Sequence, residues 1–162
     1  MVVYPNAYSS TPSVLTQVQT YNDASFVAIR IRDLTNSSFT TGLEEQESTN
    51  TGAHGVETIG WMSIDQGNTV EDGRSFESRL ISNVTHQNKT IFYQNAFSSP
   101  PILFTKLVSY AGPDPATTRV IQNTNAQATI RIMEDKSRDQ EVEHTRETIC
   151  YLAITNTAIP EP

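Results

Sequence analysis

The sequence has little of several residue types that mark common classes of protein. Its single cysteine, Cys150, excludes a disulfide within the chain. Its seven glycines form neither a Gly-x-Ser-x-Gly elbow nor a glycine-rich phosphate loop. No apolar run approaches the roughly 20 residues that a membrane-spanning helix needs. We therefore expect no enzyme activity and no insertion into a membrane.

Basic residues are also scarce. The chain has 11 Lys and Arg against 18 Asp and Glu, which gives a net charge of −7. A protein that binds the phosphate backbone of nucleic acids needs a basic face, and so does one that binds anionic lipid. We expect neither partner.

Polar residues that favour strands and turns are abundant. Ser, Thr, Asn and Gln are frequent while Leu and Ala are sparse, and no stretch shows a convincing helical apolar stripe of ten or more residues. Hydrophobic residues make up 36% of the chain, which permits a packed core. The composition indicates an all-β protein.

The strongest pattern is an internal repeat. Residues 4–21, YPNAYSSTPSVLTQVQTY, align without a gap on residues 93–110, YQNAFSSPPILFTKLVSY. Arg30 then aligns with Arg119 at the same spacing. So many ordered matches indicate a duplication.

The second half of the alignment needs one extra residue, which we place near Ala126. Glu44 then falls on Glu134, and His54 on His144. Both histidines begin a similar segment, HGVETIGWMSID in the first copy and HTRETICYLAIT in the second. Each segment is interpreted as the closing strand of its copy.

The repeat predicts two tandem domains, residues 1–67 and residues 68–162. Residues 68–90 have no counterpart before the first copy, so the first domain is expected to lack its N-terminal strand. The predicted strands are 13–20, 26–34, 39–45 and 56–65 in the first copy, and 74–84, 89–95, 102–109, 118–124, 129–134 and 147–156 in the second. Short strands between turn signals indicate antiparallel six-stranded β-sandwiches.

The second copy carries a series of core and turn motifs. Phe97 precedes SSPPILF, Arg119 opens the strand RVI, and ICYLAI at 149–154 closes the domain. This order resembles the H-type lectin domain of snail agglutinins and discoidins, and the tandem form resembles repeats of large bacterial surface or secreted proteins. The resemblance implies a six-stranded antiparallel sandwich, often trimeric, that binds galactose or N-acetylgalactosamine at subunit boundaries.

The same resemblance implies candidate ligand contacts. The sugar-contacting arginine of that family corresponds to Arg119, and by internal alignment to Arg30. The family's Trp-His pair before the last strand corresponds roughly to Thr49-Asn50 and to Asp139-Gln140. This chain therefore lacks the aromatic ring that usually stacks on the sugar at that place. Arg30 and Arg119 have an alternative role, as ion-pair partners of Glu44 and Glu134.

Two tyrosines suggest a further ligand surface. Tyr21 precedes Asn22 and Asp23, and Tyr110 is followed by Asp114. An exposed ring beside amides and carboxylates suits a sugar, since the ring packs on C–H faces and the polar groups bind hydroxyls. The same tyrosines could equally anchor their loops.

The histidines leave three interpretations open. His54 and His144 could pair with Glu57 and Glu147 at the start of the closing strand, contact a ligand, or join neighbouring acids in a metal site. We expect no cofactor, with Ca²⁺ as the one metal that the acidic loops could bind. Trp61, Tyr151 and Cys150 are predicted to be packing residues.

Two functions are consistent with these features of the sequence. The first is a non-catalytic module of a secreted or cell-surface protein that binds a glycan or polysaccharide, with its two copies raising avidity. The second is a structural module of a surface fibre, adhesin stalk or phage tail. In that role the first copy accepts its missing strand from a neighbour. The expected homo-oligomer is a trimer in the first case and a fibre in the second.

Overall fold

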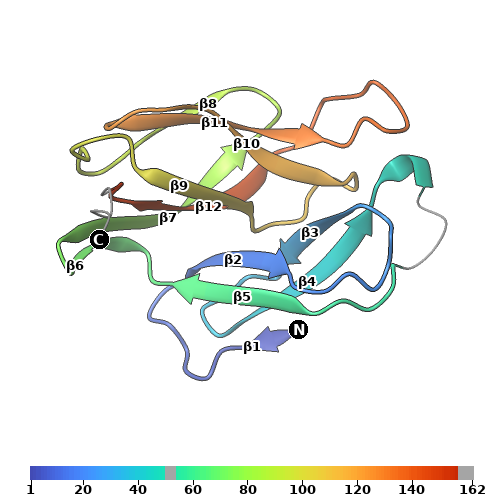
Figure 1. Cartoon of the computed structure of the whole chain (residues 1–162), viewed down its shortest axis with the longest axis horizontal. Coiled ribbons are helices and arrows are strands. Elements are labelled where there is room, and N and C mark those ends of the chain that lie inside the picture. Colours follow the sequence, from blue (N-terminus) through green and yellow to red (C-terminus); the bar gives the residue numbers. More distant parts are fainter. Residues whose placement is uncertain (50–53, 157–162) are drawn as a thin grey trace, which may run out of the picture.

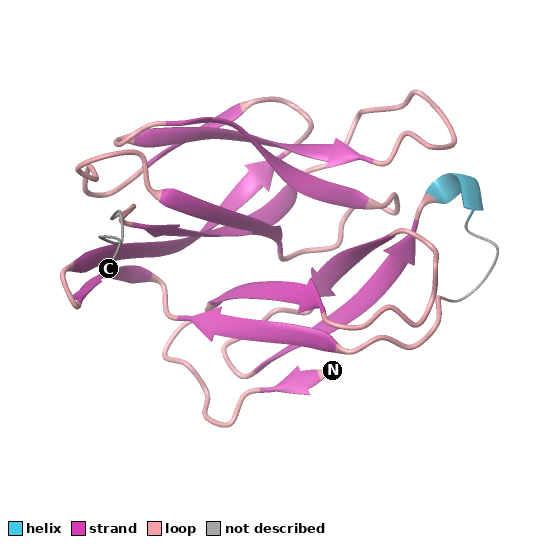
Figure 2. Cartoon of the chain, in the orientation of Figure 1, coloured by secondary structure: helices cyan, strands magenta, loops and turns pink. Residues whose placement is uncertain are grey.

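A computed structural model describes residues 1–49 and 54–156 of the chain (Figure 1). The first copy contains β1 (Val2–Val3), β2 (Ser13–Val18), β3 (Val27–Arg32), β4 (Ser38–Glu45), the 3₁₀ turn η1 (Glu47–Thr49) and β5 (Ile59–Ile64). The second contains β6 (Gly67–Glu71), β7 (Arg74–Val84), β8 (Lys89–Phe92), β9 (Ile102–Leu107), β10 (Ala116–Asn123), β11 (Gln127–Glu134) and β12 (Glu147–Ile154). Figure 2 shows how strands dominate the described residues. Among those residues, no helix has the length and apolar character needed to cross a membrane.

The strands pair antiparallel in four sheets. In the second copy the sheets have the orders β6-β7-β12-β9 and β10-β11-β8, and in the first copy β1-β4-β3 and β2-β5. No strand pairing in the described residues joins one copy to the other. The prediction of an all-β sandwich is confirmed, while the division into two domains stays a prediction.

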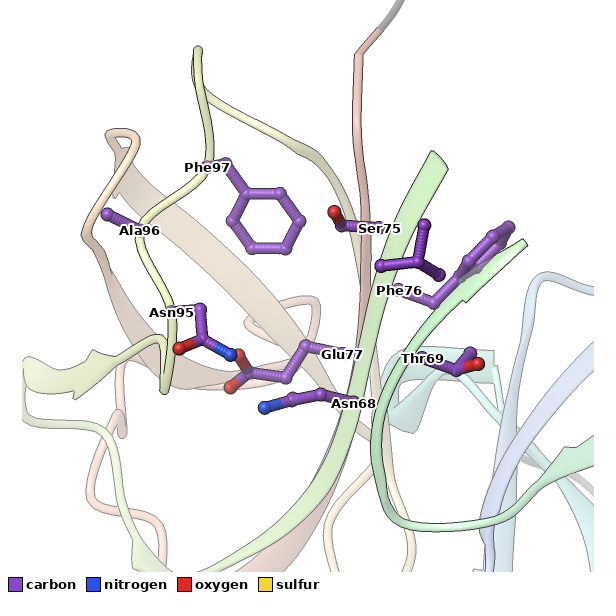
Figure 3. Close-up of a pocket in the computed structure, with 9 residues that line it drawn as sticks. Asn68, Thr69, Ser75, Phe76, Glu77, Asn95, Ala96 and Phe97 are labelled. Carbon is purple, nitrogen blue, oxygen red and sulfur yellow. The ribbon is translucent and has the colours of Figure 1, made fainter. Parts of the chain in front are cut away.

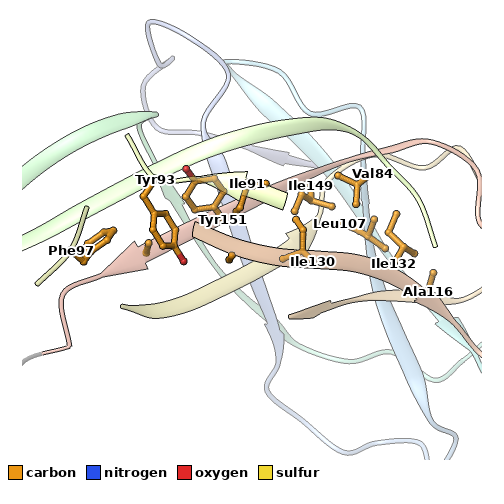
Figure 4. Packing of buried hydrophobic residues seen from close by; sticks show 12 residues of the cluster. Val84, Ile91, Tyr93, Phe97, Leu107, Ala116, Ile130, Ile132, Ile149 and Tyr151 are labelled. Atoms are coloured by element: carbon orange, nitrogen blue, oxygen red, sulfur yellow. The ribbon is translucent and has the colours of Figure 1, made fainter. Parts of the chain in front are cut away.

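The core of the second copy lies between its two sheets (Figure 4). Ile130 and Ile132 alternate with half-buried residues along β11, and Ile149, Tyr151 and Ala153 enter the same core from every second position of β12. This two-residue period places one face of each strand in the core. The other buried members of this cluster are Val84, Ile91, Tyr93, Phe97, Leu107, Ala116 and Ala128.

Strand β12 is buried on both faces, because the first copy covers the other side of its sheet. Cys150 belongs to a second buried cluster with Val14 of the first copy, and its thiol donates a hydrogen bond to the Val14 carbonyl at 3.2 Å. Burial raises the pKa of Cys150 to about 12. The predicted packing role of this cysteine is confirmed, and double burial explains the continuous apolar run of the strand.

The first copy lacks one strand, as its sequence predicts. Strand β12 pairs with β9 on one side and β7 on the other, whereas its counterpart β5 pairs, among the residues that the structure describes, only with β2. Tyr151 is completely buried, but the equivalent Trp61 is 39% exposed although its ring contacts Tyr4 and Phe39. The missing strand leaves the edge of β5 unpaired.

Two short strands were not predicted. β1 covers two residues, and β6 is a polar, mostly exposed edge strand with no apolar alternation. β6 is held in a hairpin with β7 by a two-residue turn, in which Asp72 and Gly73 have φ values of 48° and 74°. Positive φ at both residues is typical of the tight turns that join hairpins. The residues of the turn could be recognised in the sequence, but the strand that precedes the turn has no apolar alternation that would predict it.

The position of the extra residue in the repeat was wrong. Val27 pairs with Glu45 in the first copy and Ala116 with Glu134 in the second, so Glu45, and not Glu44, corresponds to Glu134. The extra residue therefore lies in the loop that precedes the closing strand of the second copy. A loop tolerates an insertion, whereas one added residue in a strand turns its side chains to the opposite face.

Candidate binding site between the repeat copies

Each copy holds a buried glutamate at the start of its closing strand. In the second copy, Glu147 accepts hydrogen bonds at Oε1 from the backbone N–H groups of Ala111 (2.8 Å) and Gly112 (3.1 Å), and at Oε2 from the Ser109 hydroxyl. Burial alone would raise the pKa of Glu147. These bonds and one from His144 outweigh burial and lower the pKa to about 2.

The first copy repeats this arrangement. Glu57 accepts hydrogen bonds from the backbone N–H groups of Asn22 (2.7 Å) and Asp23 (3.1 Å), and from the Thr20 hydroxyl. The bond from Thr20 is the main cause of the lowered pKa of Glu57. The turn after Tyr21 therefore holds the glutamate through its main chain. The side chain of Asn22 donates to the Val56 carbonyl at 2.9 Å.

His144 lies between two carboxylates of the second copy. Its Nδ1 pairs with Glu134, and its Nε2 lies 3.2 Å from Glu147 Oε1. The side chain is fully buried, which alone would lower the pKa of His144, but the hydrogen bonds and charges of Glu147 and Glu134 raise it. The pairing of histidine with glutamate at this junction is observed in both copies.

His54 has a third acidic neighbour. Its Nδ1 lies 3.2 Å from Glu45 Oε1 and 3.9 Å from Asp23 Oδ2, and its Nε2 lies 3.5 Å from Glu57. One ligand atom from each of Asp23, Glu45 and His54 could hold a cation, since these atoms lie within 4.8 Å of one another. Asp23 already accepts hydrogen bonds from Ser25 and Gly55, which lower its pKa to about 2. The second copy has Gly112 at the place of Asp23.

Gly112 is required by the close approach of His144. A Cβ at residue 112 would lie 2.6 Å from His144 Cε1, and the ring is fixed on both sides by glutamates. We expect Gly112→Ala to lower the free energy of unfolding by roughly 1–3 kcal/mol, as overpacking of a tight site does. Urea denaturation measures this loss. Gly42→Ala is the control, because a Cβ there meets no atom within 4 Å. Equal stability of the two variants would contradict the prediction.

Arg30 joins the two copies. From β3 it reaches Glu147 of the second copy at 2.9 Å and Glu44 of its own copy at 3.1 Å. It also donates to the Asp114 carbonyl at 2.9 Å, and its guanidinium lies 4.6 Å from the centroid of the Tyr110 ring. Arg30 is only 2% exposed. The alternative role that we considered, an ion pair with Glu44, is present.

Arg119 occupies a different environment from Arg30. It is exposed on the outer side of β10, and in the described ranges no carboxylate forms an ion pair with it. It lines a groove of about 400 Å³ between the copies. The residues that matter for the chemistry of this inter-copy groove are Gln17, Phe26, Lys106, Thr117, Arg119 and Asp135.

Two residues of the inter-copy groove were missed by sequence reasoning. Phe26 is 68% exposed, and burial lowers the pKa of Lys106 to about 8. The available signal was a lysine within the apolar strand ILFTKL, at the place of Gln17 in the first copy. The sequence alone does not show that Phe26 of the first copy and Lys106 of the second copy line the same groove.

The remaining candidates do not line the inter-copy groove. Tyr21 is 80% exposed, and Tyr110 lies beneath Arg30. Asp139 and Gln140 are exposed in the loop before β12, where Asp139 accepts a hydrogen bond from the Glu141 N–H. Asn50 lies outside the described residues. The structure gathers Arg30, Tyr110, Asp114 and His144 into one cluster, in which Arg30 and His144 are buried, Asp114 is half-buried and Tyr110 is exposed.

A smaller pocket of about 200 Å³ lies between the β6–β7 hairpin and residues 95–97 (Figure 3). Its one charged side chain, Glu77, is engaged by intramolecular bonds. One oxygen accepts from the Tyr151 hydroxyl and the other from the Gln94 N–H at 2.8 Å. These bonds of Glu77 hold β7 against the core, and they leave the carboxylate of Glu77 occupied rather than open to a ligand.

A comparison with known proteins finds similarity to part of a much longer protein. The chain is 28% identical over 148 residues to halomucin from Haloquadratum walsbyi. The match covers 89% of this chain but only 2% of halomucin, so the relative is a very long protein. No family model matches the chain, and no solved structure matches it.

Proposed function

We propose that the chain is a non-catalytic carbohydrate-binding module of an extracellular or cell-surface protein. The observation that carries the proposal is the inter-copy groove with the guanidinium of Arg119, which forms no ion pair within residues 1–49 and 54–156. Arg119 is also the residue that matches the sugar-contacting arginine implied by the resemblance to H-type lectins. The likeness to a short segment of halomucin, a very long protein with the name of a mucin, supports the placement in a surface molecule.

The chemistry of the inter-copy groove favours a saccharide with a carboxylate or sulfate group. The planar fork of Arg119 suits such an anion in two parallel hydrogen bonds, and Lys106 adds a second cation. The Asp135 carboxylate is engaged by the Glu47 N–H at 2.8 Å and by Ser137. The exposed ring of Phe26 offers an apolar surface for the C–H face of a sugar.

Titration calorimetry with uronate-containing, sulfated and neutral oligosaccharides tests the proposal. We expect the acidic sugars to bind, and Arg119→Gln to weaken them by about tenfold or more, since a hydrogen bond to a charged group is worth roughly 1.5–3 kcal/mol. Arg74→Gln is the matched control, because Arg74 is exposed and lies outside the inter-copy groove. Absence of binding by every saccharide would overturn the proposal.

The affinity for an acidic saccharide should fall as the pH rises from 7 to 9. Lys106 is protonated below its pKa of about 8 and neutral above it, so the ligand loses one cationic partner. We expect about tenfold weaker binding at pH 9 by calorimetry. Lys106→Met should bind weakly at both pH values, whereas Lys136→Met, a change in an exposed loop outside the groove, should keep the pH dependence. An unchanged affinity in the unmodified protein would exclude Lys106 as a contact.

A further inference from the structure

The open edge of β5 has few of the features that proteins use to block such edges. At Ser63 the Tyr8 hydroxyl donates to the main-chain carbonyl at 3.2 Å, and an incoming strand would replace this bond. Residues 59–64, IGWMSI, contain no charged residue and no proline. An uncharged, regular edge is ready to pair with another strand. The part of the chain that the structure describes pairs β5 only with β2.

The second copy shows what fills the equivalent edge. There β7 pairs antiparallel with β12, with Ile81 opposite Ile149 and Arg79 opposite Tyr151. Ile81 packs against the core of that copy. Glu77 accepts a hydrogen bond from the Tyr151 hydroxyl, and Figure 3 shows its side chain near Asn95 and Asn68. Strand β7 thus completes the sandwich and covers the central aromatic ring.

Trp61 shows the effect of the missing strand in the first copy. Its ring centroid lies 5.9 Å from that of Tyr4 and 5.7 Å from that of Phe39, so the indole already belongs to the core. Its 39% exposure, against 0% for Tyr151, is the surface that a strand on the open edge would cover. No described residue accepts a hydrogen bond from the indole N–H, whereas the Tyr151 hydroxyl donates to a strand-borne glutamate.

We infer that β5 accepts an antiparallel strand from a further copy of the same repeat, with the pattern of β7. By the register of the second copy, an isoleucine of the incoming strand lies opposite Ile59 and an arginine lies opposite Trp61. A glutamate lies opposite Ser63, at the place from which Glu77 reaches Tyr151. Main-chain hydrogen bonds give such a contact its affinity, and the alternate side chains give it specificity. This inference does not depend on carbohydrate binding.

A synthetic peptide with the sequence of residues 73–85 tests the inference on the full chain. The chain has one tryptophan, and the peptide has none, so the emission reports Trp61 alone. We expect a saturable shift of the emission to shorter wavelength, together with slower hydrogen exchange at residues 59–64. A peptide with the same composition in scrambled order should give neither effect.

Two peptide variants distinguish binding in the inferred register from nonspecific hydrophobic binding. Aspartate at the place of Ile81, which packs in the core, should weaken binding by about tenfold or more. Aspartate at the place of Ser82, which is exposed, should leave binding nearly unchanged. In a further experiment, the same strand is fused to the N-terminus of the chain through a flexible linker. The fusion raises the effective concentration of the strand at β5 to the millimolar range. An unchanged Trp61 emission in that fusion would overturn the inference, whatever the result with saccharides.

Discussion

Replacing Arg30 by methionine should lower the free energy of unfolding by roughly 3–5 kcal/mol, the usual cost of removing one partner from a buried ion pair. Arg30 is 2% exposed and supplies the cation for Glu147 and Glu44. It also binds the Asp114 carbonyl across the boundary between the copies. Its loss would remove the guanidinium that pairs with Glu147 and Glu44 and the bond to the Asp114 carbonyl, and would loosen the second copy from the first.

Urea denaturation followed by circular dichroism measures the effect of Arg30→Met. The matched control is Arg119→Met, the same change at the equivalent place of the second copy, where the side chain is exposed; we expect a loss within about 0.5 kcal/mol. A loss below about 1 kcal/mol for Arg30→Met would contradict the assignment.

Lowering the pH from 6 to 2 should remove roughly 3 kcal/mol of stability through Glu147. Its pKa is about 2 in the folded protein, against the ordinary value of 4.5. A pKa that is lower in the folded state stabilises the protein fully above pH 4.5, and this contribution is lost as the pH falls through 2. A difference of about 2.5 pKa units corresponds to roughly 3.4 kcal/mol.

Chemical denaturation at a series of pH values, with Glu147→Gln beside the unmodified protein, measures this contribution. We expect the variant to be less stable at pH 6 and to depend less steeply on pH between 4.5 and 2. Glu141→Gln, a change in an exposed loop, should follow the unmodified protein. The raised pKa of His144 acts in the opposite sense, since its stabilisation is present below 6.5 and is lost as the pH rises through the raised value. Parallel pH profiles for Glu147→Gln and the unmodified protein would show that Glu147 is not the responsible group.

Most of the sheet pattern could be predicted because local rules decide it. Strand β7 was predicted with the observed bounds, since its polar and apolar residues lie between the turns EDG and THQN. Other predicted strands ended up to three residues from the observed bounds, as for 56–65 against Ile59–Ile64. There the Thr58 N–H donates to the Thr20 hydroxyl and the Glu57 carboxylate accepts from the Asn22 N–H, in place of regular strand pairing. Such contacts join residues far apart in the sequence and leave no periodic signal.

The sequence by itself determined that the protein is an all-β duplication whose first copy lacks a strand, because alternation, turn residues and internal similarity are properties of the chain. Only the tertiary structure decided the roles of Arg30 and Arg119, which the repeat makes equivalent. Packing of the copies buries Arg30 against Glu147 and leaves Arg119 in an open groove. Burial and charge pairing depend on what lies opposite a side chain, and in this protein the second copy supplies those neighbours.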